Sequence, residues 1–197
     1  MLETYVRPIY QNYFADPIAK KISLLPQKIT YLACLTGILV MPALFFDFTK
    51  LALILMILSG FLDTLDGTVA RITDKTSSLG SILDIISDRI VEFSIMMGLF
   101  LVDPTHRAIA ILMMLGSCYL CVTIFLVIGI FTPNQSVKGF HYSPGFIERA
   151  EAFIFFGAMI IAPHYFYLLA YLFVSLVLLT CYLHIKQFIS HTKQLPK

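Results

Sequence analysis

The sequence contains few charged residues. Asp, Glu, Lys and Arg make up only 13% of its 197 residues, whereas a soluble domain carries about 25%. Hydrophobic residues make up 58%, and the mean hydropathy is +0.84. The formal net charge of +2 is too small to indicate a nucleic-acid partner. We therefore exclude a soluble domain and expect an integral membrane protein that binds no nucleic acid.

A secretory signal and a zinc set are also lacking. The stretch MLETYVRPIYQNYFADPIAKK has no early apolar core and no cleavage site, so targeting is expected to come from the membrane spans. Cys118 and Cys121 form a CxxC pair, which could indicate a redox or metal site. With no histidine or second CxxC nearby to complete a zinc site, we interpret them, like Cys34 and Cys181, as small helix residues.

Apolar runs are abundant instead. Six are long enough to cross a bilayer, which takes about 20 residues: 29–46, 50–70, 80–102, 107–131, 146–163 and 165–189. The connections are short, and no repeat or low-complexity segment occurs. We predict one all-α membrane-embedded catalytic domain over residues 1–197, with a six-helix bundle at 28–190 and a C-terminal tail at 191–197.

Residues 1–27 mix aromatic, apolar and basic side chains. This composition suits an amphipathic segment at the membrane interface, although an ordinary polar leader is the alternative. With six spans, 12 of the 14 Lys and Arg residues fall on the side of both termini, and only Lys50 and Arg107 on the other. The positive-inside rule then predicts a prokaryotic cytoplasmic (inner) membrane protein whose termini and 2–3 connection face the cytoplasm.

Aspartates interrupt the apolar pattern where the second span leads to the third, in DTLDGTVARITDKTSSLGSILDIISD. On a helix, positions 63, 66, 67 and 70 fall within an arc of about 100°, and positions 80, 84 and 88 within about 80°. Asp63 and Asp66 therefore share one face, and Asp84 and Asp88 another, whereas Asp74 is interpreted as a solvated loop charge. If the two spans pack antiparallel, four carboxylates converge at one membrane face, where charged groups indicate function.

Four unpaired carboxylates in one place would repel one another, and binding cations removes that repulsion. Oxygen ligands without His or Cys suit Mg²⁺, Mn²⁺ or Ca²⁺. Two divalent ions would balance the four charges, and a pair about 3.5–4 Å apart assists displacement at phosphorus. The spacing therefore predicts a divalent-metal site.

The residues beside the aspartates allow two interpretations each. Gly67, Ala70 and Gly80 could leave room for a ligand or allow close helix packing. Arg71 could hold a phosphate oxygen or reach the lipid headgroups. Ser77 could bind a ligand or cap the third helix.

The pattern Asp63-x2-Asp66-Gly67-x2-Ala70-Arg71-x8-Gly80-x3-Asp84-x3-Asp88 resembles the signature of the CDP-alcohol phosphotransferases, also called CDP-alcohol phosphatidyltransferases. All eight signature positions are present at the expected spacing within 26 residues. The six-span plan and the length extend the likeness over most of the chain.

The resemblance implies a membrane enzyme of phospholipid biosynthesis that is usually a homodimer. It moves a substituted phosphate from a CDP-linked lipid, such as CDP-diacylglycerol, to the hydroxyl of a small polar acceptor and releases CMP. Two divalent cations, Mg²⁺ or Mn²⁺, are implied, with these ligands: Asp63, Asp66, Asp84 and Asp88. Asp88 is also similar to the family's proposed general base. The positions implied to lie along the CDP moiety are Gly67, Ala70, Arg71, Ser77 and Gly80, and Thr30 and Tyr31 stand where a threonine often lies near the nucleotide.

The acceptor is less determined. The segment KGFHYSPGFIERAEAF, residues 138–153, resembles the region entering the fifth helix of family members that make phosphoinositide-type lipids, where basic residues hold an acceptor phosphate. Lys138 and Arg149 are available for acceptor binding here. However, alanine at 152 replaces the second arginine of an ER-x-ER pattern, which weakens the prediction of a phosphorylated acceptor. Lys138 and Arg149 could equally be topogenic charges, with Arg149 paired to Glu148 or Glu151.

Other classes of protein also use acidic residues within spans. A divalent-cation transporter would do so, but these carboxylates gather at one membrane face and no second acidic relay appears in the later spans. An aspartate-rich intramembrane prenyltransferase would need two separated motifs and more than six helices. A catalytically inactive structural relative would not need to keep every carboxylate of the motif.

Overall fold

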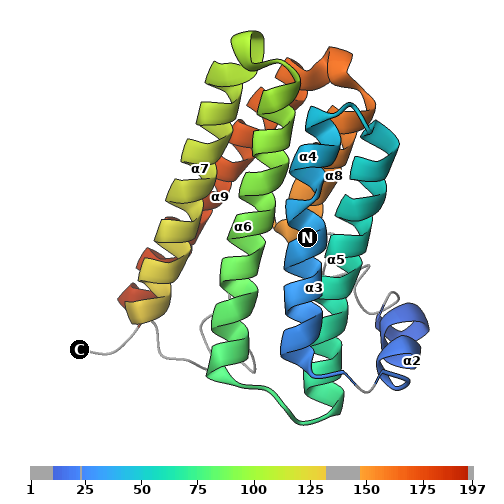
Figure 1. Ribbon diagram of the computed structural model, residues 1–197. Helices are drawn as coiled ribbons and strands as arrows, with labels where there is room; N and C mark the ends of the chain where they lie inside the picture. Colours follow the sequence, from blue (N-terminus) through green and yellow to red (C-terminus); the bar gives the residue numbers. More distant parts are fainter. Residues whose placement is uncertain (1–10, 23, 132–146, 195–197) are drawn as a thin grey trace.

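The fold is a bundle of long helices. The computed structural model describes residues 11–22, 24–131 and 147–194, and the regular elements within these ranges are all helical (Figure 1). This confirms the all-α prediction. Two short elements come first, η1 (Gln11–Ala15) and α2 (Asp16–Ala19). The elements of the bundle follow: α3 (Pro26–Ile38), α4 (Val40–Phe45), α5 (Thr49–Ile72), α6 (Ser78–Val102), α7 (Pro104–Phe131), α8 (Arg149–Ile161), η2 (Pro163–Tyr165) and α9 (Phe166–Gln194).

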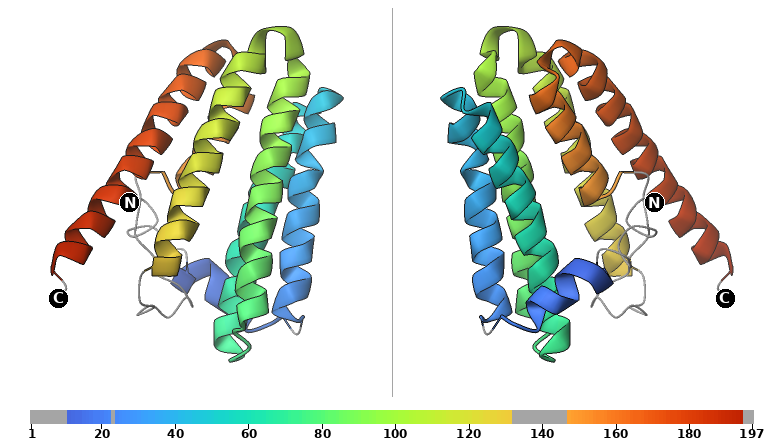
Figure 2. Two further views of the ribbon diagram at one scale, coloured as in Figure 1. Left: turned by 90° about the vertical axis from the view of Figure 1, so that its left-hand side faces the viewer. Right: turned by 90° about the vertical axis from the view of Figure 1, so that its right-hand side faces the viewer.

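The long helices run up and down along one axis (Figures 1 and 2). The turn at 73–77 joins α5 to α6 at the lower end in Figure 1, which we call the aspartate end. At the opposite end, Asp103 is the single residue between α6 and α7. Helices α7 and α9 lie side by side and run in the same direction.

The first predicted span, 29–46, is broken into α3 and α4 at Leu39. Pro42 lies within α4 and has no backbone N–H to donate to the carbonyl of Ile38, four residues earlier. The backbone N–H of Leu39 still donates to Leu35 (3.1 Å), and that of Ala43 to Leu39 (3.2 Å). The two pieces therefore run one after the other along the bundle, joined at Leu39.

Four stretches of the described residues are long and apolar enough to cross a membrane: 26–45, 49–72, 104–131 and 163–190. Helix α6 has 25 residues but carries Asp84, Asp88, Arg89 and Glu92, and α8 has only 13 residues. The described helices therefore support an integral membrane protein, while the predicted count of six spans is not confirmed.

Two glycines let helices approach closely. A Cβ atom at Gly37 of α3 would lie 2.9 Å from Ser59 Oγ of α5 and would also overlap the side chain of Val91 on α6. A Cβ atom at Gly98 of α6 would lie 2.9 Å from Leu44 Cδ1 and 3.1 Å from Met41 Cα, both on α4. Small residues at helix contacts are a common packing device in membranes, and here they hold α3, α4 and α6 together.

The N-terminal elements lie across α5 at the aspartate end (Figure 2). Ala19 of α2 packs in a small apolar cluster with Ile29, Leu65 and Val69. The side chain of Gln11 donates a hydrogen bond to Thr68 Oγ1 of α5 at 2.7 Å. Part of the predicted interfacial segment, residues 1–10 and 23, lies outside the described residues.

Candidate active site

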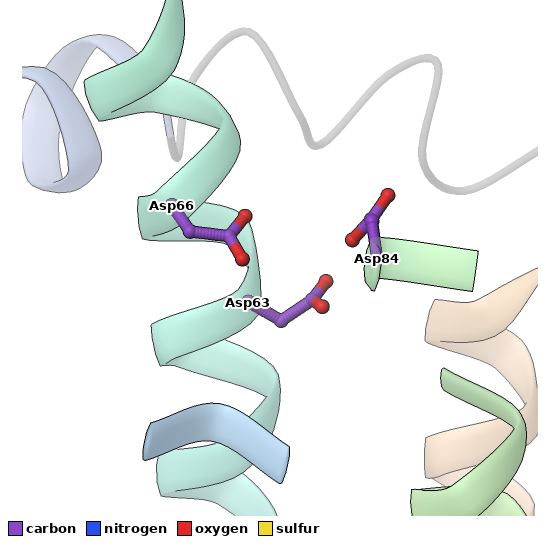
Figure 3. A group of neighbouring side chains, drawn as sticks. All are labelled: Asp63, Asp66 and Asp84. Atoms are coloured by element: carbon purple, nitrogen blue, oxygen red, sulfur yellow. The ribbon is translucent and has the colours of Figure 1, made fainter. Parts of the chain in front are cut away.

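The aspartate motif forms one cluster between α5 and α6. Asp63 and Asp66 stand one turn apart on α5, and Asp84 faces them from α6 (Figure 3). One carboxylate oxygen of each of these three lies within 4.8 Å of the other two. Helical periodicity places each pair on one face. The short 73–77 turn reverses the chain, so α5 and α6 run in opposite directions, and α3 packs against both of them.

The donor set fits a hard divalent cation. Asp66 is only 6% exposed, and its Oδ2 accepts a hydrogen bond from Thr30 Oγ1 of α3. Asp63 Oδ1 is buried without a hydrogen-bond partner. A buried carboxylate oxygen without a partner is costly, whereas oxygen-only ligands are what Mg²⁺ and Mn²⁺ prefer. The residues present therefore fit a divalent ion held by Asp63, Asp66 and Asp84.

Arg149 belongs to the same cluster. Its Nη1 forms ion pairs with Asp63 Oδ2 and with Asp88 Oδ1, so it joins the two helices and links Asp88 to the other aspartates. Its Nη2 is buried without a hydrogen-bond partner. Glu148 and Glu151, the alternative partners considered for Arg149, form the capping box at the start of α8. The guanidinium lies 5.4 Å from the centroid of the Phe153 ring.

The small residues of the motif are not in close helix contacts. A Cβ atom at Gly67 would meet Arg71 Nη1 at 3.3 Å, and one at Gly80 would meet Ser77 Oγ at 3.2 Å; within the described ranges, no other helix comes within 4 Å of either position. Ala70 is half-buried on α5. Close packing against another described helix is therefore not observed at these two glycines.

Two further motif residues make local hydrogen bonds. Arg71 is exposed at the end of α5, and its Nη2 donates to Thr68 Oγ1 at 3.2 Å. Ser77 is the N-cap of α6, and its Oγ accepts from the backbone N–H of Gly80 at 3.0 Å. Capping is thus observed for Ser77. Asp74 is exposed in the turn with a φ of 52°, a conformation that aspartate tolerates better than most residues.

The remaining candidates lie elsewhere. Lys138 falls within 132–146, outside the described residues. Tyr31 is exposed, unlike its neighbour Thr30, which contacts Asp66. Cys118 and Cys121 are free and pack against the hydrophobic core from α7. Sequence reasoning missed Gln11, whose contact with Thr68 joins residues 57 positions apart and has no local signal.

Comparison with known proteins places the chain in a family. The family model of the CDP-alcohol phosphatidyltransferases matches residues 23–185. The archaetidylinositol phosphate synthase of Methanothermobacter thermautotrophicus is 38% identical over 97 residues, which cover 47% of this chain and 47% of that protein. The same-named protein of Pyrococcus horikoshii is 31% identical over 96 residues, 49% of this chain and 51% of that one. The chain thus matches about half the length of these relatives.

A bacterial relative and a solved structure match over more of their length. Inner membrane protein YnjF of Escherichia coli is 28% identical over 156 residues, 76% of this chain and 75% of that protein. The crystal structure of Mycobacterium tuberculosis phosphatidylinositol phosphate synthase (PgsA1) with CDP-DAG bound has a TM-score of 0.74 at 20% identity, covering 89% of this chain and 93% of that one. A second structure of that protein, with manganese and citrate, has the same TM-score. The fold is therefore shared with PgsA1, and because the family model matches well over half of the sequence, this chain belongs to the CDP-alcohol phosphatidyltransferase family.

Proposed function

We propose that the protein transfers a substituted phosphate group, phosphatidyl when the donor is CDP-diacylglycerol, from a CDP-linked lipid to the hydroxyl of a small polar acceptor, and releases CMP. The observation that carries this proposal is the cluster of Asp63, Asp66 and Asp84 within 4.8 Å, in a chain that matches the family over residues 23–185. The reaction belongs to phospholipid biosynthesis.

Two divalent cations, Mg²⁺ or Mn²⁺, are the proposed cofactors. Asp63, Asp66, Asp84 and Asp88 would hold them, and the buried free Oδ1 of Asp63 supports this assignment. When bound, such cations stabilise the charge that develops as CMP leaves.

Asp88 is the proposed general base and therefore the catalytic residue. The acceptor hydroxyl oxygen forms a bond to the lipid-linked phosphorus, the bond from that phosphorus to the CMP oxygen breaks, and the hydroxyl proton moves to the Asp88 carboxylate. Asp88 lies one turn after Asp84 on α6, and its side chain is 17% exposed. Such a position suits a base whose contribution comes from holding the reacting oxygen in place.

The CDP moiety is proposed to lie over the motif residues between the two helix ends. Arg71 is exposed there, and a guanidinium matches phosphate oxygens well. No other helix of the described ranges lies within 4 Å of a Cβ atom built at Gly67 or Gly80, which supports the approach of the nucleotide to the backbone. Ala70 and Ser77 complete this proposed surface.

Arg149 is proposed to bind the acceptor, together with Lys138. The buried Nη2 of Arg149 has no hydrogen-bond partner and can donate to an oxygen of a bound ligand. A phosphorylated alcohol is the favoured acceptor class, because a guanidinium pairs with phosphate. Two relatives named archaetidylinositol phosphate synthase also favour this class.

The membrane arrangement is also a proposal. We propose six spans, an interfacial N-terminal segment and a homodimer in a prokaryotic cytoplasmic membrane, with the active site facing the cytoplasm. The support is the distribution of Lys and Arg, which puts 12 of 14 on the side of the aspartate motif.

The test is product formation by the purified protein in nanodiscs. Mg²⁺ or Mn²⁺ and CDP-diacylglycerol are supplied with glycerol 3-phosphate, inositol, inositol phosphate, serine, ethanolamine or choline in turn, and CMP and the lipid product are measured. We expect CMP with one acceptor class, and most with a phosphorylated one. Absence of CMP with every acceptor and donor would contradict the proposal, and ion flux in liposomes without lipid product would indicate a transporter instead.

A further inference from the structure

Arg149 occupies carboxylate oxygens that the metal site also needs. Its Nη1 pairs with both Asp63 Oδ2 and Asp88 Oδ1. Asp63, Asp66 and Asp84 each bring one carboxylate oxygen within 4.8 Å of the others, and Asp63 Oδ1 has no hydrogen-bond partner among the described residues. One divalent ion can be held there while the arginine stays in place.

A second divalent ion raises a conflict. Held through Asp88 and a shared Asp63, it would lie against the two carboxylates that pair with the guanidinium. Two cationic groups on the same oxygens of a site this buried would repel strongly, because the effective dielectric there is lower than in water. The guanidinium and the second ion therefore exclude each other.

We infer that Arg149 is a built-in counter-ion that competes with the second divalent cation for Asp63 and Asp88. With one ion bound, the arginine neutralises the two carboxylates and holds α5 and α6 together. Binding of the second ion releases the guanidinium from both aspartates and frees all of its N–H groups for an anionic ligand. The inference rests on the metal site of the proposed function. It adds that the first cation binds with Arg149 in place and the second binds as Arg149 leaves.

The structure offers a matched control. Arg89 lies next to Asp88 on α6, and its Nη1 pairs with Glu92 Oε2 at 2.7 Å and not with the aspartates of the cluster. Removing the charge of Arg89 lowers the positive charge near the site by the same amount as removing that of Arg149. Only the change at Arg149 vacates oxygens of Asp63 and Asp88.

The experiment is a Mn²⁺ titration of the full-length protein in detergent, with free Mn²⁺ followed by electron paramagnetic resonance. We expect one tight and one weak ion in the wild-type protein. Arg149→Gln should tighten the weak ion on the order of tenfold, the usual range of coupling between two sites. Arg149→Lys, which keeps the charge, should tighten it less, and Arg89→Gln should change it little.

Equal tightening in Arg89→Gln and Arg149→Gln would show a general charge effect and overturn the competition. Unchanged or weaker binding of the second ion in Arg149→Gln would overturn it as well. If the wild-type protein bound no Mn²⁺, that result would instead contradict the metal site of the proposed function.

A second measurement needs no substitution. Wild-type protein is treated with phenylglyoxal at one and at two equivalents of bound Mn²⁺, and modification is quantified by peptide mass spectrometry at Arg149 relative to Arg89. We expect Arg149 to react faster once the second ion binds, because its ion pairs are released. An unchanged or slower reaction would contradict the release.

Discussion

Glycines have different surroundings in two regions of the bundle. In the apolar region, Gly37 and Gly98 lie where α3, α4 and α6 touch, and an added Cβ would come within 3 Å of side chains on neighbouring helices. At the aspartate end, among the described residues, Gly67 and Gly80 would meet only side chains of their own helix or its cap. The first pair brings helices together, and the second pair lies where we propose that the nucleotide binds.

The two regions also differ in what they bury. The apolar region buries large side chains such as Phe156 and Phe173, whose rings lie 5.5 Å apart between centroids. The site region buries charged groups, including Asp66 and the ion-paired Glu92, and buried charges contribute little net stability. The apolar packing therefore supplies most of the stability that positions the site. Substitutions in the apolar region should mainly change stability, and substitutions in the site should mainly change activity.

The largest expected effect is on activity alone. Asp88→Asn removes the proposed base but keeps the shape, and CMP release should fall by about 10²–10⁴-fold, the usual contribution of general base catalysis. The unfolding temperature in detergent should fall much less than activity does, because the amide weakens one ion pair of Arg149 and leaves the apolar packing of the bundle intact. Asp74→Asn, in the exposed turn, is the control and should keep full activity; an active Asp88→Asn variant would rule out this role.

The next effect is on stability. Gly37→Ala places a methyl group against Val91 and Ser59, and overpacking of this kind costs about 1–3 kcal/mol. Thermal unfolding in detergent measures the loss. Gly116→Ala on α7 should not be destabilised, because beyond the local backbone of α7 no atom of the described residues lies within 4 Å of the added carbon. Equal unfolding temperatures of the two variants would contradict the close contact at Gly37.

Gly67→Ala should show the reverse pattern. The added methyl group lies 3.3 Å from Arg71 Nη1 and fills space assigned to the nucleotide, so the KM for the CDP-linked lipid should rise about tenfold, as for one extra methyl group in a binding pocket. Stability should be unchanged or slightly higher, because alanine favours a helix over glycine. A destabilised variant with an unchanged KM would mean that Gly67 serves packing after all.

The smallest effect is expected at the start of α6. Ser77→Ala removes the hydrogen bond from Gly80 N to Ser77 Oγ (3.0 Å), and loss of an N-cap costs about 1 kcal/mol. Thermal unfolding should detect this loss, and Ser77→Thr should restore most of it. If Ser77→Ala instead raised the KM without lowering the unfolding temperature, contact with the ligand would be the main role of Ser77.

The site was predictable in part, because much of it is local. Asp63 and Asp66 share a face by helical periodicity, and the short turn to α6 brings Asp84 opposite them, so one stretch of 26 residues encodes the cluster. The break in the first span at Leu39 was not predicted, because the apolar pattern runs on through Pro42 and the composition still reads as one span.

The sequence by itself determined the helical class, the apolar runs and the aspartate motif, since these depend on composition and on spacing within single helices. The tertiary structure alone decided that Arg149, on α8, pairs with Asp63 on α5 and Asp88 on α6. It also decided which glycines lie in close contacts between the described helices and which do not. Helical periodicity specifies a face of a helix but not the helix that will cover it, and that choice is made only when the whole bundle packs.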